Sequence, residues 1–260
     1  MTRMEFLNIK IDNLTMEEAL QRIDFFVSEG TCRYVVTPNL DHIVTLEKDP
    51  VFAEAYKNAD LILADGKSLL WISRWLKHPI KEKLSGSDLF PRICQMAAEK
   101  EYNVFLLGAE EGVAATAAEN LRKKYTGLRI VGTYSPKYGF EGDPQELAYI
   151  KSLIHMAQPD ILGVALGSPK GEKFIYAHLQ EYGVPLSISI GATLDFEAGK
   201  IRRAPKWVSE IGMEWLFRIT QDPKRMIKRY WYDAISILPI IKKYRYQKDD
   251  NIDRLNVPGR

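Results

Sequence analysis

The sequence predicts an α/β fold in which a mostly parallel sheet carries helices on both faces, followed by a basic helical appendage at the C-terminal end. Short apolar runs of strand length alternate with helical patterns in units of roughly 25–30 residues, which indicates a parallel sheet. Most of these runs are continuously apolar, as in strands buried on both faces. After Gly199 no strand pattern follows, and helical patterns rich in Lys and Arg predict the appendage.

Six segments of three to six residues are expected to form the strands of the sheet. They are Cys32–Val36, Leu61–Ala64, Asn103–Leu107, Arg129–Val131, Ile161–Leu166 and Leu186–Ile190. The first segment of the chain, Glu5–Ile11, is expected to form a small hairpin or an edge strand.

Helix starts between these strands have recognisable caps. Thr15 and Glu18 have the spacing of a capping box. Ser87 is expected to cap the next long helix, and Asp143 before Pro144 predicts an N-cap followed by proline at the first helical position.

The chain divides into three parts that differ in sequence pattern. We expect a catalytic body over residues 1–200, an appendage over residues 201–248, and a flexible polar tail over residues 249–260. The appendage should hold two helices, one over Lys206–Thr220 and a second that follows Pro223 and ends near Tyr246.

Composition favours a cytoplasmic protein. The only cysteines, Cys32 and Cys94, form no C-x-x-C pair and no cluster with histidine, which indicates free thiols in a reducing compartment. The start of the chain lacks the apolar core of a signal peptide. No stretch reaches the roughly 18 apolar residues of a spanning helix, so membrane contact is expected to be peripheral.

Charge is divided unevenly along the chain. Residues 200–248 hold 13 Lys or Arg against 4 Asp or Glu, whereas residues 1–199 hold 21 against 27. This split predicts an anionic partner for the appendage, namely lipid headgroups, phosphate or nucleic acid. Interleaved aromatic and aliphatic residues favour a helix at a membrane interface, on its cytoplasmic face. Packing on the body and contact within a homo-oligomer stay open, and nucleic acid is disfavoured because no aromatic stacking platform appears.

Ligands of open parallel sheets bind at the carboxyl ends of the strands. The segments that follow the predicted strands there are Thr37–His42, Asp65–Ser68, Gly108–Gly112, Gly167–Glu172 and Gly191–Thr193. Of the turns, Gly167 to Lys170 is the better anion site, because a lysine accompanies its backbone amides. Together the turns suggest a nucleotide-type ligand along one sheet edge.

Asp65 is the leading candidate for a catalytic carboxylate. It ends a strand, precedes Gly66, and could serve as a general base on a hydroxyl group. An aspartate that caps the helix starting near Lys67 is the alternative, and the local pattern alone favours it. Four scattered histidines without an H-E-x-x-H or D-x-D pattern predict no metal site.

Several segments together resemble the WecG/TagA/CpsF glycosyltransferases, in family order from about residue 5 to residue 240. The matching segments are Val36–His42, Leu63–Gly66, Gly86–Leu89, Leu106–Ala109, Tyr138–Phe140, Ala165–Lys170 with Glu172, Gly191–Gly199, Arg203–Trp207, Glu214–Arg218 and Asp222–Arg225. The resemblance implies a Rossmann-like fold and an inverting, metal-independent transfer without a cofactor. The sugar would move from a UDP donor to an undecaprenyl-diphosphate-linked sugar in surface-polymer synthesis.

The resemblance also assigns roles. Asp65 would be the base, and Thr37 with Asn39 would position the acceptor or the donor sugar. The loops of Gly108, Tyr138 and Gly191 would hold the uridine, and the appendage arginines would lie near phosphates. The expected substrate-binding residues are Thr37, Asn39, Lys83, Gly108, Ala109, Tyr138, Gly167, Lys170, Gly191, Arg203, Arg218 and Arg225.

Two positions depart from the family pattern. Gly171 stands where family members commonly have glutamine, and Lys83 stands near a position where arginine is frequent, which keeps the charge without the bidentate geometry. The donor sugar therefore stays open among N-acetylmannosamine, its uronic acid, glucose and glucuronic acid. A non-catalytic protein that binds nucleotide sugar or lipid carrier is the second hypothesis.

Overall fold

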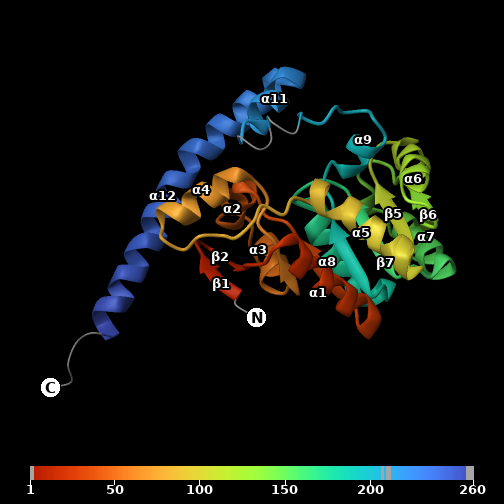
Figure 1. The fold of residues 1–260 in the computed structure, drawn as a ribbon, viewed down its shortest axis with the longest axis horizontal. Coiled ribbons are helices and arrows are strands. Elements are labelled where there is room, and N and C mark those ends of the chain that lie inside the picture. The colour runs from red at the N-terminus through yellow and green to blue at the C-terminus, as the bar shows by residue number, and fades with distance from the viewer. Residues whose placement is uncertain (1–2, 206–207, 209–211, 256–260) are drawn as a thin grey trace.

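The computed structural model describes residues 3–205, 208 and 212–255, and side chains are described for these except Arg225 and residues 246–255. A six-stranded sheet in the order β4-β3-β8-β7-β5-β6 forms the centre (Figure 1). Its strands are β3 Arg33–Val36, β4 Leu61–Ile62, β5 Asn103–Gly108, β6 Arg129–Tyr134, β7 Ile161–Ala165 and β8 Leu186–Ser189. All neighbouring strands pair in parallel, so the predicted sheet is confirmed.

Helices cover both faces of this sheet. One face packs against α1 Met16–Glu29, α5 Gly86–Lys100, α6 Val113–Lys124 and α9 Thr193–Glu197. The other face packs against α2 Leu40–Leu46, α3 Pro50–Lys57, α4 Lys67–Trp75, α7 Pro144–Ala157 and α8 Lys170–Tyr182. A short 3-10 turn, Phe140–Gly142, precedes α7. Except for the edge strand β6, which is largely part-buried or exposed, the strands are buried on both sides, which explains their continuously apolar sequences.

The predicted N-terminal hairpin forms from β1 Arg3–Phe6 and β2 Ile9–Asp12, as a separate two-stranded sheet. Asp12 is buried, accepts a hydrogen bond from the Ile62 amide at 2.9 Å and pairs with Arg3 at 2.9 Å. These bonds fasten the hairpin to the edge strand β4.

Two of the three expected helix caps are confirmed. Thr15 and Glu18 form the capping box of α1, and Asp143 caps α7. The expected cap at Ser87 is wrong: Ser85 caps α5, because its hydroxyl accepts from the Asp88 amide at 3.2 Å. Ser87 therefore lies within the first turn.

The appendage consists of α11 Glu214–Gln221 and α12 Pro223–Leu255. The expected single helix over Lys206–Thr220 is wrong, because Gly212 has a φ of 81°, which interrupts a right-handed helix before α11; Lys206, Trp207 and residues 209–211 lie outside the described residues. Helix α12 packs on α2 and α11 and extends past the expected end near Tyr246 (Figure 1). Ile237, Ile240 and Ile241 bury its inner face against the body.

No helix within the described part of the chain is long and apolar enough to cross a lipid bilayer.

Candidate active site

Asp65 follows β4 at the carboxyl edge of the sheet, where its backbone amide donates to the Pro38 carbonyl at 2.8 Å. Gly66, with a φ of 100°, is the N-cap of α4, and this cap makes no side-chain hydrogen bond. The helix-cap alternative for Asp65 is therefore wrong. The structure gives no hydrogen bond to its carboxylate from the described side chains, so the oxygens are available to a ligand.

The surroundings of Asp65 favour its neutral form more than water would. Burial raises the pKa of the Asp65 carboxyl to about 7, and the charges of Glu214 and Asp88 act in the same direction. Lys83 and Arg218 oppose the rise. A carboxyl with a pKa near neutrality is suited to accept a proton during a reaction at that pH.

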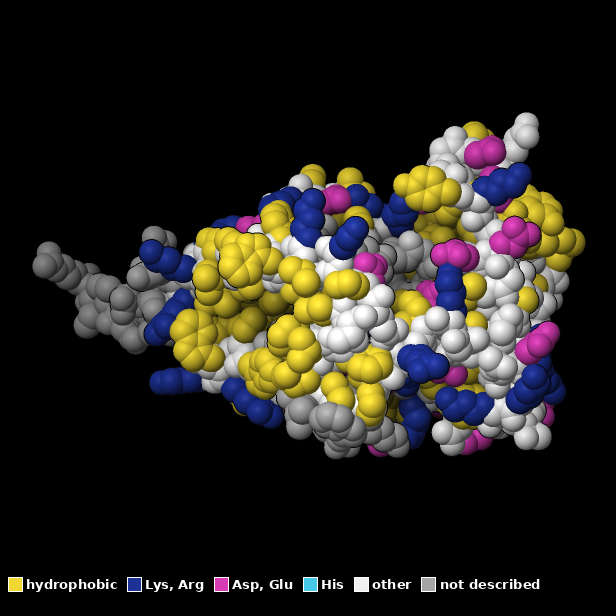
Figure 2. Space-filling model, turned by 90° about the horizontal axis from the view of Figure 1, so that it is seen from above, with side chains coloured by type: hydrophobic (Ala, Val, Ile, Leu, Met, Phe, Trp, Pro, Cys, Tyr) yellow, Lys and Arg dark blue, Asp and Glu magenta, His cyan; other side chains and the backbone are white. Residues whose placement is uncertain are grey.

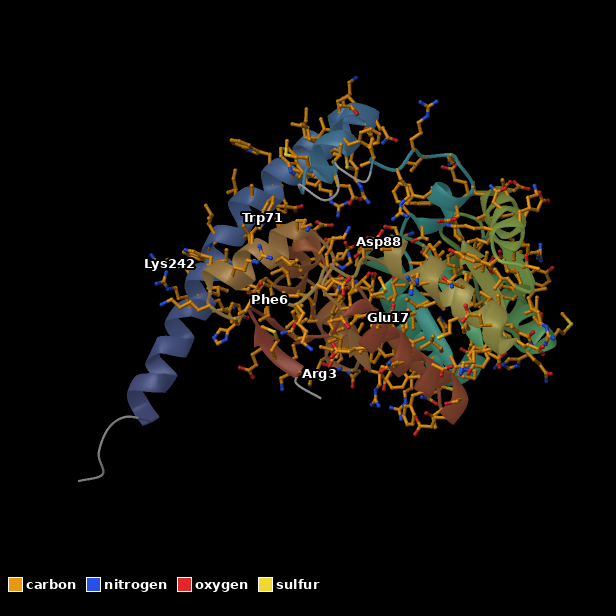
Figure 3. The ribbon with its side chains drawn as sticks, viewed as in Figure 1. Arg3, Phe6, Glu17, Trp71, Asp88 and Lys242 are labelled. Atoms are coloured by element: carbon orange, nitrogen blue, oxygen red, sulfur yellow. The ribbon has the colours of Figure 1, made fainter. Side chains whose placement is uncertain are left out.

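Cations from the body and the appendage gather beside Asp65. Lys83 lies before α5 and pairs through Nζ with Asp88 at 2.9 Å and with Glu214 at 3.7 Å. Arg203 pairs with Asp88 at 2.5 Å, and Arg218 pairs with Glu214 at 3.1 Å. Figure 3 shows Asp88 near the middle of the molecule, between the body helices and the appendage. The appendage therefore contributes directly to this charged cluster.

A cavity of about 470 Å³ opens within the cluster, of a size that ligand sites commonly have. Phe196 of α9 forms one wall, and the guanidinium groups of Arg203 and Arg218 lie 5.8 and 5.6 Å from its ring centre. The lining residues are Lys67, Glu82, Lys83, Asp88, Phe196, Arg202, Arg203, Ala204, Glu214, Phe217 and Arg218. Of the expected site residues, Lys83, Arg203 and Arg218 thus meet in one cavity; the side chain of Arg225 lies outside the described residues.

Thr37 and Asn39 follow the neighbouring strand β3, so they lie beside Asp65 on the same edge. Thr37 is buried, and its hydroxyl lies 3.4 Å from the position that a Cβ on Gly86 would take. Asn39 is the N-cap of α2, and its side-chain oxygen accepts from the His42 amide at 3.3 Å. Asn39 therefore has a structural role, as the cap of α2, in addition to its expected role in positioning a sugar.

Further expected residues lie along the same edge, at the ends of β8, β7 and β5: Gly191, Gly167, Gly108 and Ala109. The connection from β5 leads outward to β6, whereas the connection from β7 leads inward to β8, so the strand order reverses between these two strands. Gly108 is the last residue of β5 and Gly167 follows β7, so both lie at this switch point, where open α/β sheets bind ligands. The Ala109 amide donates to the Ala165 carbonyl at 2.8 Å, which holds the two loops together. Gly191, with a φ of 51°, follows β8.

Tyr138 and Lys170 lie together but outside the cavity beside Asp65. The Lys170 ammonium lies 4.5 Å from the centre of the Tyr138 ring and pairs with Glu141 at 2.8 Å. Tyr138 is 98% exposed. The Tyr138 side chain is therefore open to solvent, and Lys170 already has an anionic partner.

Gly171, the position that departs from the family pattern, is buried at the start of α8. A Cβ on Gly171 would lie 3.1 Å from the Ser189 hydroxyl, so Ser189 occupies the space that a longer side chain would need. Ser189 donates to the Glu172 carboxyl at 3.0 Å, and burial raises the pKa of Glu172 to about 7. A buried hydroxyl and a buried carboxyl thus stand at this point of the edge.

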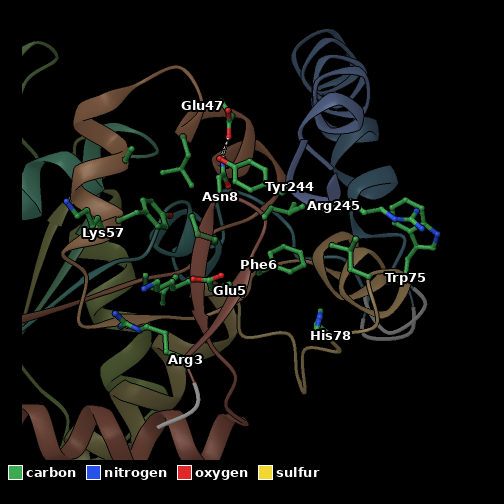
Figure 4. A pocket seen from close by; sticks show the side chains of 18 of the residues that line it. Arg3, Glu5, Phe6, Asn8, Glu47, Lys57, Trp75, His78, Tyr244 and Arg245 are labelled. Atoms are coloured by element: carbon green, nitrogen blue, oxygen red, sulfur yellow. Dashed lines mark hydrogen bonds between the residues drawn. The ribbon is translucent and has the colours of Figure 1, made fainter. Parts of the chain in front are cut away.

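A larger cavity, of about 1100 Å³, lies elsewhere (Figure 4). It opens between the N-terminal hairpin, the end of α4 at Trp75 and the helix α12 at Tyr244 and Arg245. Neither Asp65 nor any expected substrate-binding residue lines it. Asp65 does not line the smaller cavity either, but Lys83 and Arg218, which do, act on its charge. We therefore place the candidate site at the smaller cavity, which three of the expected substrate-binding residues line.

Several residues that line this site were not expected from the sequence, among them Asp88, Phe196 and Glu214. The spacing of Ser85 and Asp88 is that of an N-cap and the third helical position, and Glu214 stands four residues before Arg218. Each spacing predicts a local contact, of Asp88 with Ser85 and of Glu214 with Arg218. Neither spacing predicts that Asp88 and Glu214 lie close together. Among the described residues, no group of three or more His, Cys, Asp or Glu could hold a metal ion.

Comparison with known proteins identifies related sequences over nearly the whole chain. The model of the family described as "Glycosyl transferase WecG/TagA/CpsF family" matches residues 4–251. A relative from Bacillus spizizenii is 28% identical over 212 residues, which cover 82% of this chain and 78% of the relative. One from Bacillus subtilis strain 168 is 28% identical over 227 residues (86% and 84%), and one from Staphylococcus aureus strain MW2 is 27% identical over 226 residues (86% and 87%). All three are named N-acetylglucosaminyldiphosphoundecaprenol N-acetyl-beta-D-mannosaminyltransferase.

Proposed function

The chain belongs to the glycosyl transferase WecG/TagA/CpsF family, and from this premise we propose that it moves N-acetylmannosamine or a related sugar from a UDP donor to a sugar on undecaprenyl diphosphate. The names of its relatives support this donor sugar and this acceptor. The single observation that carries the proposal is the Asp65 carboxyl, whose pKa burial raises to about 7 and which lies beside a cavity lined by cations.

In this function Asp65 takes the proton of the acceptor hydroxyl as its oxygen attacks the anomeric carbon of the donor sugar. The bond between that carbon and the β-phosphate oxygen of UDP breaks in the same step. The new bond forms on the opposite side of the sugar from the bond that breaks, so the configuration at the anomeric carbon is inverted. Thr37 and Asn39, next to Asp65 on the sheet edge, position the reacting sugars.

The leaving diphosphate gains negative charge as the bond breaks. Lys83, Arg203 and Arg218 surround the 470 Å³ cavity and stabilise that charge. The loops of Gly108 and Gly167 approach the rest of the nucleotide at the switch point. Because Arg203 and Arg218 follow the body in sequence, the site is complete only when the appendage is docked.

The appendage also brings the enzyme to its lipid substrate at the inner face of the cell membrane. Hydrophobic side chains gather on the face that carries α11 and α12, with Lys and Arg around them (Figure 2). The exposed apolar residues of these helices are Trp215, Leu216, Ile227, Trp231, Tyr232, Ile235 and Leu238. An apolar face with cations beside it suits the headgroup zone of an anionic membrane.

The test is turnover by the full chain on vesicles that contain N-acetylglucosaminyl-diphosphoundecaprenol. With UDP-N-acetylmannosamine we expect one UDP and one disaccharide-lipid per cycle, and no product with Asp65→Ala. Parallel reactions use UDP-glucose, UDP-glucuronic acid and the UDP-linked uronic acid of N-acetylmannosamine to identify the donor. Binding of UDP without turnover of any UDP-sugar would instead support the non-catalytic binding protein.

A further inference from the structure

The cations of the candidate site are already engaged by two carboxylates of the protein itself. Asp88 contacts Lys83 and Arg203, and Glu214 contacts Lys83 and Arg218. A single ammonium, that of Lys83, lies 2.9 Å from one carboxylate and 3.7 Å from the other. Two anionic groups thus lie side by side among three cations.

This arrangement is the one that a diphosphate needs, with two linked anionic groups shared between cations. We propose that Asp88 and Glu214 are place-holding anions, which occupy the diphosphate subsite of the empty enzyme and give up their cations when a diphosphate binds. The inference rests on the proposed function and gives a role in it to two further residues, Asp88 and Glu214. The ligand class is a diphosphate, from either the nucleotide donor or the lipid-linked acceptor.

The exposure of both carboxylates makes this exchange feasible. The side chains of Asp88 and Glu214 are 34% and 33% exposed, so each has water to turn into when it leaves its cation. Their pairs with Arg203 and Arg218, in which each side chain is 33–44% exposed, contribute little net stability. The two phosphates of a diphosphate each carry a negative charge and are covalently linked, so a single ligand can satisfy the cations that two separate carboxylates held.

The two carboxylates also come from different parts of the chain. Asp88 belongs to α5 of the body, whereas Glu214 belongs to α11 of the appendage. Their shared cation, Lys83, therefore joins appendage and body when the subsite is empty, and a diphosphate in the same place joins them through its own oxygens. The two carboxylates thus hold Lys83 of the body close to Arg203 and Arg218 of the appendage, and keep the appendage docked, before substrate binds.

The contrasting role for the two acids is to orient the cations while the diphosphate binds beside them. The two roles predict opposite signs. Removing a place-holding charge removes a competitor and tightens diphosphate binding, whereas removing an orienting charge loosens it. Substitution by the isosteric amide keeps the shape of each side chain and tests the sign directly.

Titration calorimetry of the full chain measures this sign with UDP and, separately, with geranyl diphosphate. We expect Glu214→Gln and Asp88→Asn each to bind one or both probes about three- to tenfold more tightly than the unsubstituted chain. The probe that gains affinity identifies whether the nucleotide or the lipid diphosphate uses the subsite. Glu17→Gln, which breaks an exposed ion pair with Arg92 on the body, is the control and should leave both affinities unchanged.

Failure of this inference is distinct from failure of the proposed function. An unsubstituted chain that binds neither UDP nor geranyl diphosphate contradicts the proposed function. If it binds a diphosphate and both variants bind equally or more weakly, place-holding is wrong. Asp88 also accepts from the Ser85 hydroxyl at 2.6 Å, so a loss of folding in Asp88→Asn is checked by thermal melting, and Glu214→Gln then decides.

A second measurement uses the pH profile. Among the described residues, Lys83 and Arg218 lower the pKa of Asp65, while Glu214 and Asp88 raise it. Removing either acid should therefore move the acidic limb of kcat/KM to lower pH, because kcat/KM reports the free enzyme. An unmoved limb would contradict the placement of these charges around the base.

Discussion

Arg229 of helix α12 pairs with Asp41 in the first turn of helix α2 at 2.9 Å. The same guanidinium lies 4.0 Å from Asp233, which is buried, and burial together with the Asp41 charge raises the pKa of Asp233 to about 6. Helix α2 begins at its cap Asn39, one of the expected substrate-positioning residues. The appendage is thus bound to the body through the helix that leads into the candidate site.

We expect Arg229→Met to reduce the free energy of unfolding by about 1–3 kcal/mol, because it leaves two carboxylates together without their cation. Denaturant unfolding checks the loss. The double variant Arg229→Met, Asp233→Asn should recover part of it, since one of the two acids is then neutral. Arg92→Met, at an exposed pair, should cost about 0.5 kcal/mol or less. Equal losses at both arginines would contradict an anchoring role for Arg229.

Asp65→Asn should lower kcat by roughly 10²- to 10⁴-fold, the usual contribution of a general base. Asparagine keeps the shape of the side chain and cannot accept the proton. We expect the variant to bind UDP and its melting temperature near neutral pH not to fall, because no hydrogen bond from the described side chains reaches the carboxylate and burial disfavours its charge. Initial rates with saturating donor and acceptor measure the effect. A variant with more than a tenth of the activity would exclude Asp65 as the base.

The rate should fall as the solution becomes acidic. Burial raises the pKa of Asp65 to about 7, and the base works only when ionised, so kcat/KM should drop tenfold per pH unit below about pH 7. Glu172 has a pKa raised to a similar value by burial and is the competing source of such a limb. The limb should therefore persist in Glu172→Gln. If Glu172→Gln removes it, the titration belongs to that residue.

Membrane docking should depend on the exposed apolar side chains of α12. Trp231 and Leu238 are 71% and 66% exposed, and replacing both by serine removes apolar area from the face that we propose to enter the headgroup zone. We expect at least a fivefold loss of binding to vesicles rich in phosphatidylglycerol, measured by sedimentation. Met156→Ser is the matched control, because Met156 is 74% exposed on α7, away from this face. Equal losses in both variants would point to a nonspecific effect.

The sequence was sufficient for the sheet, because strands buried on both faces have continuous apolar runs that local pattern reveals. It was not sufficient for the charged site, whose parts are distant in sequence. Asp88 and Glu214 meet at Lys83 only through the path of the chain after β8, which no periodicity encodes. Likewise, whether Asp65 caps α4 depends on the backbone of Gly66, whose φ of 100° makes the glycine the cap.

The switch point between β5 and β7 provides the last prediction, because Gly108, the last residue of β5, pairs there with Ala165, the last residue of β7. A Cβ on Gly108 would lie 2.5 Å from the Ala165 carbonyl oxygen, and Gly108 has a φ of 108°. Gly108→Ala therefore meets both backbone strain and a clash with backbone, and we expect it to destabilise the fold by about 2–4 kcal/mol.

Gly112 provides the matched control for this substitution. It has a φ of 80° and nothing within 4 Å of its Cβ position, so Gly112→Ala should cost only the strain of a left-handed residue, about 1–2 kcal/mol. Denaturant unfolding of both variants measures the difference. In UDP titration, Gly108→Ala should also weaken binding at a temperature where it stays folded, whereas Gly112→Ala should not. Equal effects on stability and on binding would show that the contact between the two loops does not shape the nucleotide site.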